Sequence, residues 1–174
     1  EMAPKKQIEK ATFPHVVESA VENGSGPEAL YAALDLGTNS CRMLIAQPKG
    51  AQFHVIDSFA KSVQLGSGLE KTGKLSRDSM NRTIQALKVC KQKLDKYDVK
   101  YSRLIATEAC RRAKNSKDFI LKVFQETGLK LNIIDTEEEA RLAVISCAPL
   151  VSSKSEQLLA VSYTHLRAHE TTSY

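Results

Sequence analysis

The sequence predicts an α/β domain whose elements follow the order β-β-β-α-β-α-β-α. Two observations carry this prediction. Residues 31–64 hold short apolar stretches separated by turn residues, which is typical of strands joined by tight connections. From residue 76 onward, apolar residues recur at helical spacing in three segments, and short apolar strands lie between these segments. Strands that alternate with helices indicate a sheet that contains parallel pairs and is covered by helices.

The first three elements are expected to form an antiparallel meander. Residues 31–37, Tyr-Ala-Ala-Leu-Asp-Leu-Gly, predict a buried strand that stops at its glycine. Residues 41–47 predict a second strand, and Pro-Lys-Gly at residues 48–50 predicts a turn. Residues 53–64 alternate roughly in polarity and predict a third strand.

The pattern then changes to the period of a helix. Residues 65–69 and 72–73 are rich in glycine and predict a loop. Ser76 is a good N-cap for the helix that follows. The apolar face of this helix is expected to consist of Met80, Ile84, Leu87, Cys90 and Leu94.

Two further strands and one helix are expected next. Residues 103–107 and 131–134 predict short apolar strands. Between them, Ser116 can cap a helix that ends at Gly128. The apolar face of that helix is expected to be Phe119, Ile120, Val123 and Phe124.

Residues 137–148 predict a last helix that stops near Pro149, and residues 158–161 predict the start of another strand. Residues 1–29, which contain Asn-Gly-Ser-Gly-Pro near their end, predict a flexible N-terminal arm. Residues 30–160 are then expected to be an incomplete N-terminal subdomain.

Residues 161–174 are expected to be a non-native tail. Val161–Thr171 resembles a translated sequencing adapter, so the natural sequence is expected to continue differently after about Ala160. His165 and His169 stand four residues apart beside a glutamate and imitate a pair of helical metal ligands. Because of the adapter resemblance, we do not expect a metal site there.

The composition narrows the classes of function. No apolar run approaches the roughly 20 residues that span a bilayer, so no membrane segment is expected. The formal net charge of +5 suits a polyanionic substrate, and nucleic acid is not expected because no basic cluster is interleaved with aromatic residues. The four cysteines form no C-x-x-C pair and are expected to be reduced packing residues of a cytoplasmic protein: Cys41, Cys90, Cys110 and Cys147.

The first motif that can carry chemistry is Asp-Leu-Gly-Thr-Asn-Ser, which begins at Asp35 directly after the first strand. Gly37 permits a turn whose backbone N–H groups can face one oxyanion. Short polar side chains can add further donors, at Thr38, Asn39 and Ser40. Asp35 can hold a hydrated divalent cation against phosphates. The alternative is an ordinary hairpin turn, where the same residue types are common.

The second motif follows the strand at residues 103–107 and contains Arg111 and Arg112, either of which can clamp a phosphate. For Arg112 a surface role is preferred. The third motif, Asp135–Leu142, contains three adjacent glutamates at a strand-to-helix junction. Acidic residues favour a first helical turn, but three exceed what a cap requires. Like charges raise one another's pKa, so one of these carboxylates can serve as a general base.

Together these three motifs resemble the exopolyphosphatase / guanosine pentaphosphate phosphohydrolase family, over residues 31–160. That family has a D-x-G-[ST]-N-S loop, then A-T-x-A-x-R, then G-x-E-E-A-R-L, and the same patterns appear here in the same order. A departure is Thr136-Glu137, where the family often has glycine followed by another residue. The resemblance implies the first subdomain of the actin-like ATPase, or ribonuclease H-like, fold.

Carried over by this resemblance, Glu139 is the catalytic base and a metal ligand, Arg111 binds phosphate, and Asp35 is a metal ligand. The first phosphate loop is then Gly37, Thr38, Asn39 and Ser40. The implied cofactor is Mg²⁺, and the implied substrate is inorganic polyphosphate or guanosine pentaphosphate. The family's second glycine-rich phosphate loop should follow residue 160, so the fragment itself is expected to be inactive. The resemblance leaves a homodimer open for the full-length protein.

Two alternatives remain open from the sequence. One is a sugar-kinase or chaperone-like ATPase of the same superfamily, which also begins with D-x-G-T. The E-E-A-R-L segment after a strand argues against it. The other is a nucleotide-binding module without chemistry, and an intact second glycine-rich loop would argue against that reading.

Overall fold

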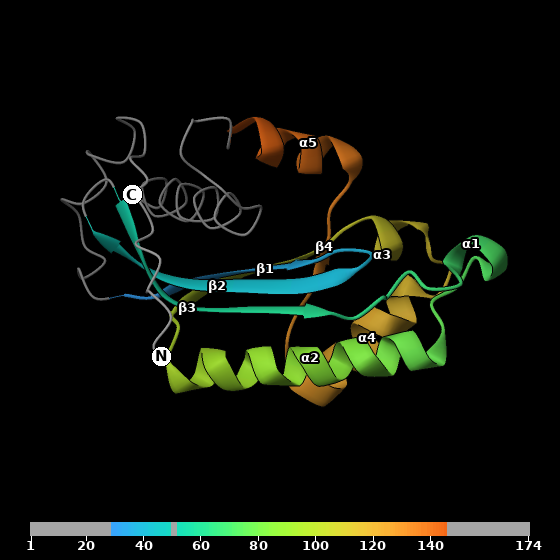
Figure 1. Ribbon diagram of the computed structural model, residues 1–174, viewed down its shortest axis with the longest axis horizontal. Helices are drawn as coiled ribbons and strands as arrows, with labels where there is room; N and C mark the ends of the chain where they lie inside the picture. The colour runs from blue at the N-terminus through green and yellow to red at the C-terminus, as the bar shows by residue number, and fades with distance from the viewer. Residues whose placement is uncertain (1–28, 50–51, 146–174) are drawn as a thin grey trace, which may run out of the picture.

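The computed structural model describes residues 29–49 and 52–145, in which five strands form one sheet of order β3-β2-β1-β4-β5 (Figure 1). The strands are β1 (Tyr31–Leu36), β2 (Ser40–Lys49), β3 (Gln52–Ser62), β4 (Tyr101–Ala106) and β5 (Asn132–Ile133). The helices are α1 (Leu69–Thr72), α2 (Arg77–Lys96), α3 (Glu108–Arg112), α4 (Ser116–Thr127) and α5 (Thr136–Ile145). Within these residues, no helix is long and apolar enough to cross a bilayer.

The sheet combines antiparallel and parallel pairs, as the sequence predicts. β1 is antiparallel to β2, and β2 is antiparallel to β3, which confirms the predicted meander. On its other side β1 is parallel to β4, and β4 is parallel to β5. The carboxyl ends of β1, β4 and β5 therefore lie at the same edge of the sheet.

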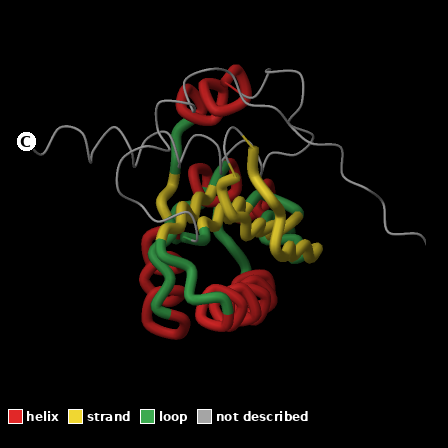
Figure 2. The backbone as a smooth tube through the Cα atoms, turned by 90° about the vertical axis from the view of Figure 1, so that its left-hand side faces the viewer, coloured by secondary structure: helices red, strands yellow, loops and turns green. Residues whose placement is uncertain are grey.

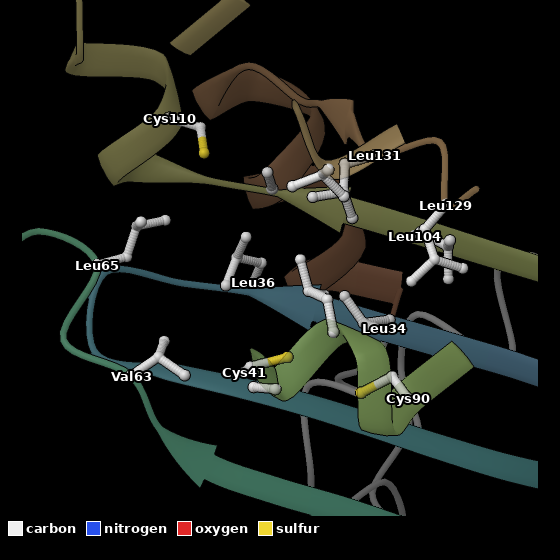
Figure 3. Close-up of a cluster of buried hydrophobic side chains, with 14 of the residues drawn as sticks. Leu34, Leu36, Cys41, Val63, Leu65, Cys90, Leu104, Cys110, Leu129 and Leu131 are labelled. Atoms are coloured by element: carbon white, nitrogen blue, oxygen red, sulfur yellow. The ribbon is translucent and has the colours of Figure 1, made fainter. Parts of the chain in front are cut away.

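The two faces of the sheet are covered differently. Side chains alternate along a strand, so Leu34 and Leu36 of β1 face the opposite way from Ala33 and Asp35. Leu34 and Leu36 belong to the main core, together with Cys90 of α2 (Figure 3). The helices α2 and α4 cover this face, and α5 lies on the other side of the sheet (Figures 1 and 2).

The helices α2 and α4 begin close to where the sequence predicts, and α4 ends at the predicted glycine. Ser76 caps α2, because its side chain accepts a hydrogen bond from the N–H of Ser79 at 3.1 Å. The predicted face of α2 is buried except for Met80, which is half-buried. Asn115, rather than Ser116, occupies the N-cap position of α4, and Gly128 ends that helix with φ +75°. In α4 Phe119 and Val123 are buried, whereas Phe124 is 43% exposed.

Several predicted boundaries differ from the structure. The predicted turn at residues 48–50 is partly strand, since β2 continues through Lys49. Pro48 is tolerated there because β1 begins only opposite Ala46, so that at Pro48 the strand β2 has β3 alone as its neighbour. The short helix α1 runs from the end of the predicted loop at residues 65–69 into the predicted loop at residues 72–73. A second short helix, α3, is also not predicted by the sequence.

The last predicted strand is shorter in the structure, where β5 consists of Asn132 and Ile133, and the last helix begins at Thr136. Several predictions lie outside the described residues: residues 1–28 of the predicted arm at 1–29, the helix end at 146–148, Cys147, the strand at 158–161 and the tail.

Candidate functional site

The turn after β1 is a tight hairpin into β2. The N–H of Gly37 donates to the carbonyl oxygen of Ser40 at 3.0 Å and closes the turn. Gly37 therefore shapes the loop through its backbone, and its N–H is already engaged. Within the described part of the chain, the N–H groups of Thr38 and Asn39 donate no hydrogen bond. These two groups, with the side chains of Thr38, Asn39 and Ser40, are the donors that the hairpin can offer to an anion.

A second segment, residues 63–66, supports this hairpin through backbone hydrogen bonds. The N–H groups of Val63 and Gln64 both donate to the carbonyl oxygen of Asn39, at 2.9 and 3.0 Å. The N–H of Gly66 donates to the carbonyl oxygen of Thr38 at 3.0 Å. A Cβ atom at Gly66 would lie 2.4 Å from Cγ2 of Thr38, so the close approach requires glycine.

The carboxyl ends of three parallel strands bring the sequence motifs to one edge. Leu36 of β1 stands beside Ala106 of β4, and Ala106 stands beside Ile133 of β5. Buried Thr107 follows β4, and its N–H donates to the carbonyl oxygen of Leu36 at 3.0 Å. Ligands of α/β proteins commonly bind outside the carboxyl ends of parallel strands. The hairpin, α3 and the start of α5 are therefore neighbours where a ligand is expected.

The arginine of the second motif contacts the glutamate of the third. Nη2 of Arg111 lies 2.9 Å from Oε2 of Glu139, and Nη1 donates to the carbonyl oxygen of Ile134 at 3.0 Å. The two side chains are 20% and 25% exposed, so they are partly shielded and still accessible. Arg111 thus joins α3 to the start of α5, and the structure brings together two residues that lie 28 positions apart in the sequence.

The other carboxylates of the acidic segment have distinct structural roles. Oδ1 of Asp135 accepts a hydrogen bond from the N–H of Glu138 at 2.7 Å and caps α5. Oε1 of Glu138 pairs with Nη2 of Arg103 at 2.6 Å. Glu138 and Glu139 therefore each face an arginine, which offsets the mutual repulsion suggested by the sequence. Arg103 was missed because its partner lies 35 residues later.

Asp35 lies on the sheet face that also carries α5. It is 6% exposed and stands opposite exposed Arg42 in the β1–β2 register. Strand alternation places Asp35 with Ala33 on the side opposite the main core, and Ala33 is the register neighbour of Arg103, which pairs with α5. Asp35 and the helix of Glu139 are therefore on the same face of the sheet.

A magnesium ion fits this donor set only in company with other oxygen ligands. Among residues 29–49 and 52–145, no group of three or more His, Cys, Asp or Glu side chains could hold a metal. Mg²⁺ is usually held by one or two carboxylates together with waters and substrate phosphates. Asp35 and Glu139 each offer a carboxylate of the kind that such binding uses.

The cysteines of the described region are packing residues, as predicted. Cys41, Cys90 and Cys110 are buried and free. The contact of Cys41 with Cys90, together with burial, raises the pKa of the Cys41 thiol far above its usual range. Burial raises the pKa of Cys110 to about 12. Thiols of this kind remain protonated at neutral pH, so these two do not serve as nucleophiles.

Arg112 lies on the surface, in agreement with the preference from sequence. Its Nη1 atom lies 2.7 Å from Oε1 of Glu70 and 3.3 Å from Oε1 of Glu108. The hydrogen bond from Arg112 lowers the pKa of the Glu70 carboxyl. Arg112 therefore links α3 to α1 rather than joining Arg111 at the site.

Comparisons with known proteins show which family this chain and its fold are similar to. The model of the Ppx/GppA phosphatase family matches residues 44–160. A solved Ppx/GppA family member from Aquifex aeolicus is 37% identical, with a TM-score of 0.64 over 66% of this chain and 38% of that one. An exopolyphosphatase from Cytophaga hutchinsonii is 26% identical, with a TM-score of 0.63 over 65% of this chain and 36% of that one. The chain thus spans less than two fifths of either relative. These matches confirm the predicted actin-like, ribonuclease H-like α/β fold.

Proposed function

The chain belongs to the Ppx/GppA phosphatase family, and from this premise we propose that residues 30–160 supply one wall of a site that hydrolyses terminal phosphoanhydride bonds. The proposed substrate is inorganic polyphosphate or guanosine pentaphosphate. The observation that supports this most directly is the contact of Arg111 with Glu139, at the same edge of the sheet as the hairpin that follows β1. It brings a candidate phosphate-binding cation and a candidate base to one edge of the sheet.

The hairpin and Arg111 would bind the terminal phosphoryl group. The N–H groups of Thr38 and Asn39 and the hydroxyl groups of Thr38 and Ser40 are neutral donors suited to phosphate oxygens. Arg111 adds a planar, permanently charged guanidinium that can bind two phosphate oxygens. Phosphoryl transfer depends mainly on positioning and charge neutralisation, which these groups provide.

Glu139 would act on the attacking water. A carboxylate orients a water molecule by accepting its hydrogen bond, and takes up the proton as the oxygen attacks in line with the departing phosphate chain. The ion pair with Arg111 fixes where the carboxylate lies relative to the phosphate-binding arginine. Arg103 contributes indirectly, since it pairs with Glu138 on the same turn of α5.

We propose that Asp35 and Glu139 hold the cofactor Mg²⁺, which when bound neutralises charge on the phosphates. Asp35 is suited to this role by its position at the end of β1 on the α5 face of the sheet. We also place the protein in the cytoplasm, because its three described cysteines are unpaired, as is usual in a reducing compartment.

The test is Glu139→Gln in a complete enzyme that contains residues 30–160 of this sequence. The isosteric amide keeps the shape and removes the base, so substrate affinity should persist while kcat falls by about 10²–10⁴-fold. Glu137→Gln, an exposed neighbour on the same helical turn, is the matched control and should retain activity. Unchanged kcat in the Glu139 variant would remove that residue from its role.

Phosphate release by the complete enzyme should be measured with three substrates: polyphosphate, guanosine pentaphosphate and ATP. Release from either of the first two, and little from ATP, supports the proposal. Release from ATP alone would assign the protein to the ATPases of the same fold. Binding of all three without release would indicate a nucleotide-binding module.

A further inference from the structure

Arg82 on α2 reaches the segment that supports the phosphate-binding hairpin. Its Nε donates to the carbonyl oxygen of Val63 at 3.1 Å, and its Nη2 donates to the carbonyl oxygen of Gln64 at 3.3 Å. Nη2 also lies 3.2 Å from Oγ of Ser79, which orients the guanidinium on the helix. Arg82 thus holds two consecutive carbonyl groups between β3 and α1.

The residue held in this way has an unusual backbone conformation. Gln64 has φ +50°, in the left-handed region that residues with a side chain adopt at a cost. Such residues persist only where the surroundings hold them, and they concentrate at functional sites. Here Arg82 holds the carbonyl groups of Val63 and Gln64, and the carbonyl oxygen of Asn39 accepts hydrogen bonds from the N–H groups of the same two residues.

We propose that Arg82 is a positioning residue for the phosphate loop at residues 38–40, acting through Gln64. The contacts form a chain from α2 to Arg82, from Arg82 to residues 63–64, and from there to Asn39. Within the described residues, the hydrogen bonds of Arg82 go to Val63, Gln64 and Ser79 and none goes to the loop itself. This inference rests on the proposed role of the hairpin in binding phosphate.

The experiment uses the isotopically labelled 174-residue chain, observed by NMR, with inorganic tripolyphosphate as the probe. Arg82→Ala should accelerate amide hydrogen exchange at Val63 and Gln64 at least tenfold, because their turn loses its support. It should also weaken tripolyphosphate binding, followed at the Thr38 and Asn39 amides, by roughly tenfold, which corresponds to the loss of about one well-placed hydrogen bond. The amide spectrum itself reports that the variant is folded.

The control is Arg77→Ala, which removes an equal charge from an exposed position on the same helix and should change neither measurement. A second variant separates positioning from direct contact. Gln64→Gly removes the penalty of the left-handed conformation. In the Arg82→Ala background, it should therefore restore at least half of the lost affinity on a logarithmic scale.

Three outcomes would overturn the inference. If Arg82→Ala behaves like Arg77→Ala in the exchange measurement, the support does not exist. If affinity falls but Gln64→Gly restores none of it, Arg82 contacts phosphate directly and is not a positioning residue. If the unaltered chain shows no tripolyphosphate shift at Thr38 or Asn39, the proposed function of the hairpin fails and the inference fails with it, whatever the exchange rates show.

Discussion

Gly66→Ala should disturb the hairpin through a single steric contact. The added Cβ atom would lie 2.4 Å from Cγ2 of Thr38, whereas nonbonded carbon atoms rest about 3.5–4.0 Å apart. Gly66 does not have a left-handed φ, so the cost arises from this contact and not from the backbone conformation. Either the methyl group of Thr38 must rotate or the two segments must separate.

The size of the effect follows from what each response costs. Overpacking of a well-filled region typically costs about 1–3 kcal/mol. Separation of the segments would also weaken the hydrogen bond from the N–H of Gly66 to the carbonyl oxygen of Thr38, worth about 1 kcal/mol. Urea denaturation of the 174-residue chain should therefore show a loss of about 1–3 kcal/mol in the free energy of unfolding.

Thr38→Ser provides the decisive second measurement. Serine lacks the Cγ2 methyl group and keeps the hydroxyl, so the double variant should recover more than half of the lost stability. Gly128→Ala is the control, since Gly128 has φ +75° and no atom within 4 Å of its added Cβ. It should cost about 1 kcal/mol through backbone conformation alone, and Thr38→Ser should not restore it.

Two results would refute this reasoning. If Gly66→Ala is as stable as the unaltered chain, the two segments do not approach one another as closely as the structure shows. If Thr38→Ser fails to restore stability in the double variant, the cost does not arise from the Thr38 methyl group.

Three further predictions concern the rest of the domain. A double-mutant cycle of Arg103→Ala and Glu138→Ala, measured by urea denaturation, should give a coupling energy of about 0.5–1 kcal/mol, because both side chains are partly exposed; additive single effects would argue against the ion pair. The hydrogen bond from Lys93 lowers the pKa of Asp57. The contribution of this ion pair to the free energy of unfolding is therefore present above the ordinary Asp pKa of about 3.9, and it is lost as pH falls through the lower pKa of the folded state. The stability difference between the unaltered chain and Asp57→Asn should thus shrink modestly, as expected for a partly exposed pair, on going from pH 7 to a pH below the lowered pKa of Asp57, and a constant difference would contradict the pairing. Phe119→Ala should cost about 3–5 kcal/mol in thermal or urea unfolding because Phe119 is fully buried, and a loss below 1 kcal/mol would place it outside the core.

The sequence predicts the long elements of this fold because their signals are local. Ser76 and the apolar positions after it specify α2 within one stretch of chain, and the short apolar strands with tight connections between them specify the meander in the same way. The helices α1 and α3 have four and five residues, and isolated helices of that length are unstable in water. They depend on contacts such as the burial of Leu69 and the Arg112–Glu70 pair, which no local pattern reveals.

The candidate site likewise contains residues that the sequence predicts and residues that it does not. Arg111 and Glu139 each lie in a motif at the end of a strand, and the resemblance to the exopolyphosphatase family singles them out within those motifs. The parallel arrangement of the strands brings the two motifs together. Arg103 and Arg82 carry no such signal. Their partners lie 35 and 18 to 19 residues away, so their roles are visible only once the strands and helices are assembled.

The place of β1 between β2 and β4 also has a consequence for biosynthesis. Its partner β2 follows almost at once, whereas its partner β4 begins at Tyr101, after the whole of α2. On a ribosome, the backbone N–H and C=O groups along one side of the apolar strand β1 therefore stay unpaired until β4 has emerged. Unsatisfied strand borders recruit other polypeptides, so we expect nascent chains that end before β4 to self-associate more readily than chains that include it.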